Sequence, residues 1–219
     1  MTRQAAAASA DPAQPDPPAA ILDAVCCVQF CAAGKWGLLL AILVKMSWEI
    51  WVPAEVDKEV RDKDKKYPGT RDNWKRFTAN DRVRVQTKLV AGPDPSSLHE
   101  RVAAEVIRLR SAAHGLSLGP DKDLGETAVV AYGVVLTKDG RDVLVLLDDG
   151  PGVGLAVDND LQVVEMADLL ILGHRQGVKG LEKAEDVRKV YDQLRPYGSS
   201  LVPWESSGVK QRLRGAGTP

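Results

Sequence analysis

The stretch ILDAVCCVQFCAAGKWGLLLAILVKM, from Ile21 to Met46, is long and apolar enough to suggest a membrane helix. A spanning helix needs roughly 20 predominantly apolar residues. Polar side chains interrupt this run at Asp23, Gln29 and Lys35, and two glycines divide it further. We therefore expect the opening of a buried α/β core in a cytoplasmic protein with no membrane contact.

Asp23 is the residue of this stretch that needs an explanation. It follows Ile21 and Leu22 and precedes Ala24 and Val25, and burying an unpaired carboxylate is costly. The apolar residues before it are typical of a short buried strand that runs into a helix. This interpretation places Asp23 where the strand ends.

Composition describes an ordinary soluble chain. Its 219 residues fit one domain with extensions, and hydrophobic residues make up 44% and charged residues 27%. A formal charge of -1 excludes a whole-protein attraction to nucleic acid or acidic membranes, so any such attraction must be local. We expect a disordered Ala/Pro-rich leader at residues 1–19, a domain at 20–205 and a basic, Gly-rich tail at 206–219.

The three cysteines lie close together, at positions 26, 27 and 31. They form no CxxC pair, and no histidine is near enough in sequence to complete a zinc site. Cys27 and Cys31 are one helical turn apart, which suits two small apolar side chains in a core. We interpret all three as reduced packing residues.

Segments typical of strands alternate with segments typical of helices along the rest of the chain. The run VLVLL, residues 143–147, is unbroken and apolar, as in a strand buried on both faces of a parallel sheet. Further strands are expected at residues 49–52, 82–85 and 161–164, with helices after Pro53, Ser97 and Gly125 and around 165–175 and 181–194. The alternation in 82–85 favours an edge strand. The pattern predicts a three-layer α/β/α sandwich with a central, mostly parallel sheet.

Acidic residues follow several of these strands. Asp23 ends the first, Asp148 and Asp149 end VLVLL, Glu59 lies in the helix after the second strand, and Glu126 opens a later helix. Ligands of parallel α/β sheets bind beyond the carboxyl ends of the strands. Two charges about 4 Å apart repel by roughly 4 kcal/mol at an effective dielectric constant near 20, so converging carboxylates need a cation, a shared proton or an Arg or Lys partner. Oxygen ligands without His or Cys select Mg²⁺ or Mn²⁺.

Each of these acids also has a plain structural interpretation. Asp149 is equally suited to cap the next helix, and Glu126 to be a first-turn acid favoured by the helix dipole. Glu59 alone fits a solvated surface position.

Four segments, taken in order, resemble the PIN-domain nucleases, the superfamily that includes the toxin ribonucleases of VapBC-type toxin–antitoxin pairs. They are ILDA…GKWGLLLAI, WVPAEVDKEV, LGETAVVAYG and VLVLLDDGPGVGLA, and the resemblance runs from about Ala20 to Gly215. The second segment is similar to the family's V-P-x-x-V-x-x-E element, which places the acid on Glu59 rather than on Glu55. The chain departs from the family at Val25, where Asn, Ser or Thr is common, and at GPGVG, where an Arg is common.

The resemblance implies a metal-dependent endoribonuclease that cleaves single-stranded RNA. The catalytic residues implied are Asp23, Glu59, Glu126 and Asp148. The implied ligands of one or two Mg²⁺ or Mn²⁺ ions are Asp23, Glu126, Asp148 and Asp149. A small antitoxin and a second copy of the chain are the protein partners it implies.

The segment 61–88 is basic, with ten Lys or Arg and four Asp, and it contains Tyr67, Trp74 and Phe77. Under the nuclease hypothesis it is a path for RNA, with cations on phosphates and an aromatic ring on a base. The candidate contacts are Lys65, Lys66, Arg71, Trp74, Lys75 and Arg76. The alternative is a solvated, charged connection with an aromatic side chain packed inward.

Two other functions compete with the nuclease. One is a catalytically weak or inactive PIN-like module that binds RNA or a protein. The other is a phosphatase-like hydrolase with Asp23 as nucleophile, but such enzymes usually have a second Asp two residues later, where this chain has Val25.

Overall fold

A five-stranded sheet forms the centre of the molecule, and all of its strands are parallel. The structure, a computed structural model, describes residues 16–89, 94, 96–112, 124–148, 150–198 and 201–215. The strand order is β3-β2-β1-β4-β5. The strands are β1 (Ala19–Leu22), β2 (Glu49–Val52), β3 (Val83–Val85), β4 (Val143–Leu146) and β5 (Gln162–Val164). The predicted edge strand is confirmed, since β3 pairs with β2 alone.

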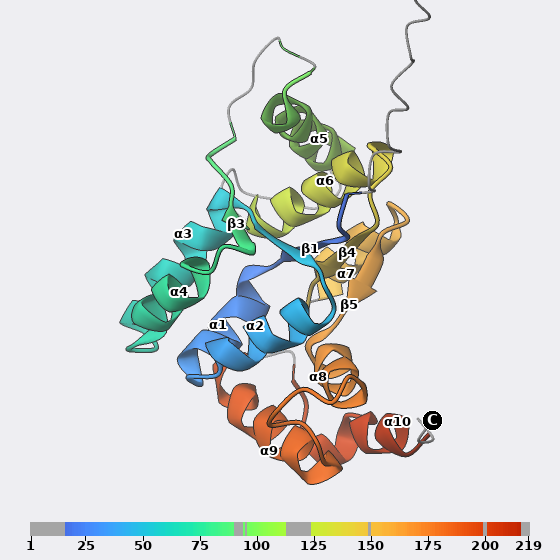
Figure 1. Cartoon of the computed structure of the whole chain (residues 1–219). Helices are drawn as coiled ribbons and strands as arrows, with labels where there is room; N and C mark the ends of the chain where they lie inside the picture. The colour runs from blue at the N-terminus through green and yellow to red at the C-terminus, as the bar shows by residue number, and fades with distance from the viewer. Residues whose placement is uncertain are drawn as a thin grey trace, which may run out of the picture.

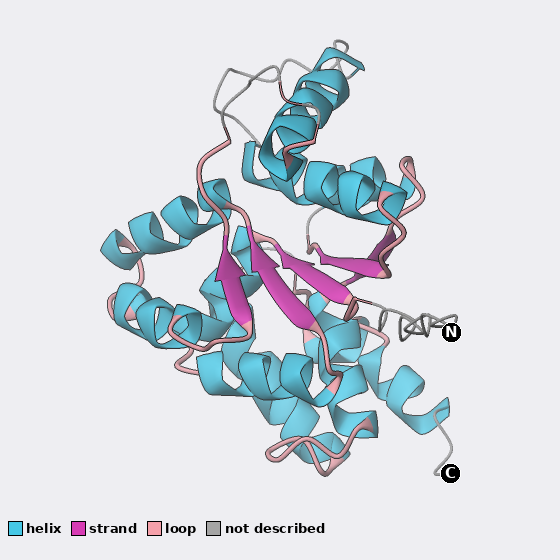
Figure 2. Cartoon of the chain, turned by 45° about the horizontal axis from the view of Figure 1, so that its top comes forward, coloured by secondary structure: helices cyan, strands magenta, loops and turns pink. Residues whose placement is uncertain are grey.

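Helices cover both faces of the sheet, so the predicted three-layer α/β/α sandwich is confirmed (Figure 1 and Figure 2). In Figure 1, α5 and α6 lie above the sheet, α1, α2, α8 and α9 lie below it, and α3 and α4 lie beside β3. The helices of the described ranges are α1 (Ala24–Ala32), α2 (Trp36–Lys45), α3 (Ala54–Asp62), α4 (Thr70–Thr78), α5 (Leu98–Ala112), α6 (Leu124–Lys138), α7 (Gly150–Val157), α8 (Met166–Arg175), α9 (Ala184–Leu194) and α10 (Val209–Gly215).

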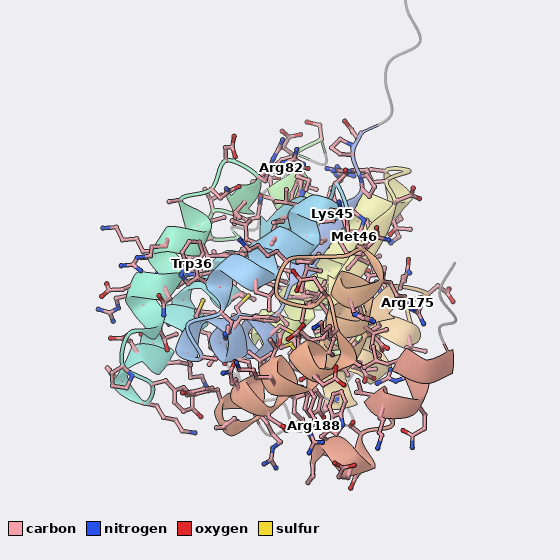
Figure 3. The ribbon with its side chains drawn as sticks, turned by 60° about the horizontal axis from the view of Figure 1, so that its bottom comes forward. Trp36, Lys45, Met46, Arg82, Arg175 and Arg188 are labelled. Carbon is pink, nitrogen blue, oxygen red and sulfur yellow. The ribbon has the colours of Figure 1, made fainter. Side chains whose placement is uncertain are left out.

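The apolar stretch that starts at Ile21 forms the end of β1 and the helices α1 and α2. All four residues of β1 are fully buried, because helices pack on both sides of a parallel strand. Helix α2 lies at the surface of its layer, with Trp36 at its start and Lys45 and Met46 at its end (Figure 3). No helix in the described part of the chain has the length and apolar character of a membrane span.

The three cysteines are buried and are not joined in disulfides, as predicted. All three belong to α1. Burial raises the pKa of Cys31 to about 12 and raises that of Cys27 as well. Both side chains therefore stay protonated and act as small apolar groups in the core.

The domain is slightly longer at both ends than predicted. Ala19, which we assigned to the leader, is the first residue of β1, and the carbonyl of Pro18 accepts a hydrogen bond from the amide of Glu49 at 2.9 Å. The segment predicted as a basic tail contains α10, whose Val209 and Leu213 are buried in the core. Residues 1–15 lie outside the described ranges.

Candidate functional site

Asp23 and Asp148 follow adjacent strands at the carboxyl edge of the sheet. Leu22 of β1 pairs with Leu146 of β4, and the amide of Asp23 donates a hydrogen bond to the carbonyl of Leu146 at 3.1 Å. Asp23 is only 2% exposed, whereas Asp148 is half-buried. The sheet register therefore brings these two predicted acids to neighbouring positions.

Both aspartates also meet the start of a helix. Asp23 is the N-cap of α1, and its Oδ2 accepts a hydrogen bond from the amide of Val25 at 3.0 Å. The Oδ1 of Asp148 accepts one from the amide of Met166, the first residue of α8, at 3.1 Å. Helix N-termini stabilise negative charge, so both bonds favour carboxylates at this edge of the sheet. The side chain of Val25 is apolar and cannot hydrogen-bond Asp23, but the main-chain amide of Val25 does so.

Glu59 and Glu126 come together in a pocket between α3 and the start of α6. Its volume is about 1000 Å³. An added Cβ at Gly125 would lie 3.5 Å from Oε2 of Glu59, which shows how closely the two helices approach there. The charged residues that line the pocket are four carboxylates and three lysines: Glu55, Glu59, Asp62, Glu126, Lys58, Lys63 and Lys88.

The sequence of α3 explains the charged wall. Glu55, Lys58, Glu59 and Asp62 lie three and four positions apart, so they share one face of the helix. Val56 and Val60, on another face, are buried in the core. Within the pocket, Lys63 Nζ lies 3.5 Å from Oε1 of Glu59, and both side chains are 44% exposed.

The pocket and the aspartates lie at the same edge of the sheet. Helix α3 begins directly after Pro53, which follows the carboxyl end of β2, the neighbour of β1. Helix α6 leads into the amino end of β4 and packs on β1 and β4, so its first turn lies toward the carboxyl edge. All four predicted catalytic acids are thus positioned at this edge, two at strand ends and two in the pocket.

Sequence reasoning missed the other charged residues of the pocket. The family-like element places its acid on Glu59, yet Glu55 also lines the pocket. The signal available was the helical spacing of charges after Pro53. Lys88 shows no such spacing, because it follows β3 and is brought to the pocket by the tertiary structure.

The donor chemistry of this edge fits a hard divalent cation. Its ionisable ligands are carboxylates, while the cysteines are buried in α1 and the Nδ1 of His174 contacts the carbonyl of Leu181 at 2.6 Å. In the described ranges no three His, Cys, Asp or Glu side chains form one metal-sized group. Asp149, a predicted ligand, lies outside those ranges. Asp23, Glu126 and Asp148 are the predicted ligands that the structure describes, and they lie at this edge without forming one metal-sized group.

The prediction that Trp74 stacks on a base is wrong. Trp74 is fully buried, its Nε1 donates to Oδ1 of Asp57 at 2.8 Å, and its ring stacks on the buried Phe77 at a centroid distance of 5.2 Å. The inward-packed alternative is confirmed for these rings. The five predicted cationic contacts are exposed: Lys65, Lys66, Arg71, Lys75 and Arg76.

Comparison of the chain with protein-family models, with curated proteins and with solved structures gave no match. Function therefore has to be inferred from the acidic edge and its pocket.

Proposed function

We propose that this protein is a metal-dependent endoribonuclease that cleaves single-stranded RNA. The observation that supports this most is the placement of four acids from four separate elements at the carboxyl edge of one parallel sheet. Asp23 is the strongest of them, because a carboxylate that is 2% exposed at a strand end costs free energy unless its surroundings stabilise the charge. Ligands of parallel sheets bind at this edge.

A bound Mg²⁺ or Mn²⁺ would supply an activated water and would stabilise the leaving oxygen of a phosphodiester. The protein's own part is to hold carboxylate oxygens in place before RNA arrives. The caps on α1 and α8 do this for Asp23 and Asp148. The approach of α3 to Gly125 places Glu59 beside the start of α6, where Glu126 lies.

The metal requirement tests this function directly. We expect the purified chain to cut a labelled single-stranded RNA when Mn²⁺ or Mg²⁺ is present and to stop when EDTA removes the ion. Gel analysis of the fragments measures this, with double-stranded RNA as the comparison substrate. If the chain leaves every RNA intact with either ion but still binds RNA, the non-cutting RNA-binding module replaces the nuclease.

The pocket lysines are the best placed phosphate contacts. Lys58 and Lys88 are exposed, line the pocket that holds Glu59 and Glu126, and make no salt bridge within the described ranges. They offset part of the negative charge of the pocket wall, so an RNA backbone can approach the acids. Lys63 is less available, because it pairs with Glu59.

We expect the double variant Lys58→Ala/Lys88→Ala to bind single-stranded RNA more weakly. The slope of log K against log salt should fall by about 0.7 for each lysine that contacts a phosphate. Fluorescence anisotropy at several salt concentrations gives both quantities. The control is Lys179→Ala/Lys189→Ala, two exposed lysines near and in α9, away from the pocket lining. Equal slopes for the two double variants would contradict this placement of the RNA.

The small antitoxin and the homodimer stay predictions of the resemblance.

A further inference from the structure

The start of α8 is held by a residue of the sheet edge. The N-cap of this helix, Glu165, makes no capping hydrogen bond through its own side chain. The amide of Met166, the first residue of α8, instead donates to Oδ1 of Asp148 at 3.1 Å, and Met166 is fully buried. The first amides of a helix have no partner within the helix, so a buried one needs an acceptor from elsewhere. Whatever keeps the first turn of α8 in place therefore also keeps this hydrogen bond to Asp148.

The C-terminal segment, residues 201–213, packs on the same helix. It contains η3 (Trp204–Ser206) and most of α10, and α10 packs on α8 (Figure 1). The segment has four buried apolar side chains: Leu201, Trp204, Val209 and Leu213. Its Arg212 forms an ion pair with Asp168, in which Nη1 of the arginine contacts Oδ1 of the aspartate. Asp168 belongs to the first turn of α8, so this ion pair holds the turn whose first amide binds Asp148.

A second set of contacts fixes the segment to α9. The hydroxyl of Tyr191 donates to the carbonyl of Val202 at 2.8 Å, and the Tyr191 ring meets that of Trp204 edge-on at a centroid distance of 5.4 Å. Nη2 of Arg188 lies 3.1 Å from Oε1 of Glu205. The segment thus makes one exposed ion pair with α9, through Arg188, and one with α8, through Arg212. The two pairs offer a matched comparison.

We propose that residues 201–213 form a C-terminal brace for the first turn of α8 and that Arg212 is a positioning residue for the Asp148 carboxylate. Arg212 acts through Asp168 and the helix start, without a contact to Asp148 being required. One arginine of the segment predicted as a basic tail then belongs to the support of the acidic edge. The effect of the brace on RNA cleavage rests on the proposed function, whereas its effect on the hydrogen bond to Asp148 does not.

Hydrogen exchange at single amides, followed by NMR, tests this inference. Arg212→Gln should speed exchange of the Met166 amide about 2- to 5-fold, which corresponds to the loss of an exposed ion pair. The side chains of Arg212 and Asp168 are 40% and 46% exposed, so this variant should fold. The amide of Val25, which donates to Asp23 at the same edge of the sheet, should exchange as in the wild type.

Three further variants separate the brace from general effects. Leu213→Ala removes a buried side chain of the brace and should speed exchange at Met166 roughly 10-fold or more. Arg212→Lys keeps the positive charge and should exchange like the wild type. Arg188→Gln breaks the exposed pair with α9 and should leave the Met166 amide unchanged.

The outcomes distinguish this inference from the proposed function. Unchanged exchange at Met166 in Arg212→Gln overturns the positioning role, even where Leu213→Ala has an effect. Equal acceleration at Met166 and Val25 would show that the segment stabilises the whole fold, and an equal effect of Arg188→Gln would show that the α8 pair has no special part. Both results overturn the inference. RNA cleavage with Mn²⁺ is measured on the same samples. A wild type that cuts no RNA while Arg212→Gln speeds exchange at Met166 alone overturns the nuclease proposal and leaves the brace standing.

Discussion

Asp23→Asn is expected to lower metal-dependent RNA cleavage by roughly 10²- to 10³-fold or more, the scale seen when a charge-stabilising group is removed from an active site. The substitution removes the negative charge that would hold the proposed cation. It keeps the shape of the side chain and an oxygen that can accept the hydrogen bond from the amide of Val25. Asn and Asp are about equally good N-caps, so α1 should keep its start.

The measurement is a cleavage time course with Mn²⁺, paired with thermal melting of the same samples. Asp186→Asn is the matched control, because the Asp186 carboxylate accepts a hydrogen bond from the amide of Lys183 at the start of α9, away from the pocket. Glu126→Gln should behave like Asp23→Asn. An Asp23→Asn protein that cleaves at the wild-type rate would show that Asp23 is a helix cap and nothing more.

The two central strands, β1 and β4, were predictable because they are unbroken apolar runs. Residues 19–22 and 144–146 are buried between the helix layers, and that burial requires apolar side chains at every position. The alternation in Val83–Val85 marked the edge of the sheet for the same physical reason. A short stretch of sequence therefore indicates whether a strand is central or at the edge, because consecutive residues of a strand show which of its faces are buried.

The site was predictable only in part, because a pocket depends on how helices approach one another. The positions of Asp23 and Asp148 follow from strand ends, which the sequence marks. Glu59 and Gly125 are 66 positions apart, and nothing in the local pattern of either helix places them together. The hydrogen bond from the amide of Met166 to Asp148 could not be predicted either, because it joins segments that are distant in the sequence.

The burial of Trp74 in the basic segment 61–88 also depends on tertiary packing that the local sequence does not show. Charges on both sides of it suggested an exposed ring, but α4 packs against α1 and α3 and covers that face. The exposed lysines and arginines around it then surround a buried aromatic pair. Exposure of one side chain in an amphipathic helix therefore says little about its neighbour in sequence.

Trp74→Ala is accordingly expected to destabilise the fold by about 3–5 kcal/mol, the usual cost of emptying a large aromatic site in a core. The ring stacks on Phe77 with an interplanar angle of 15°, so its loss also exposes that partner to a cavity. Asp57 would lose the indole N–H but keep its contact with Arg61, at 2.9 Å. Urea denaturation followed by circular dichroism measures the change in the free energy of unfolding.

Trp74→Phe separates packing from RNA contact. It keeps an aromatic ring in the core and removes the hydrogen bond to Asp57, so its cost should be smaller than that of Trp74→Ala. A buried ring cannot reach a base, so RNA affinity of the folded Trp74→Phe protein should equal that of the wild type. If Trp74→Ala were as stable as the wild type and lost RNA affinity instead, the ring would have to leave the core to bind a base. The packing of α4 against α1 and α3 would then be an equilibrium between two arrangements.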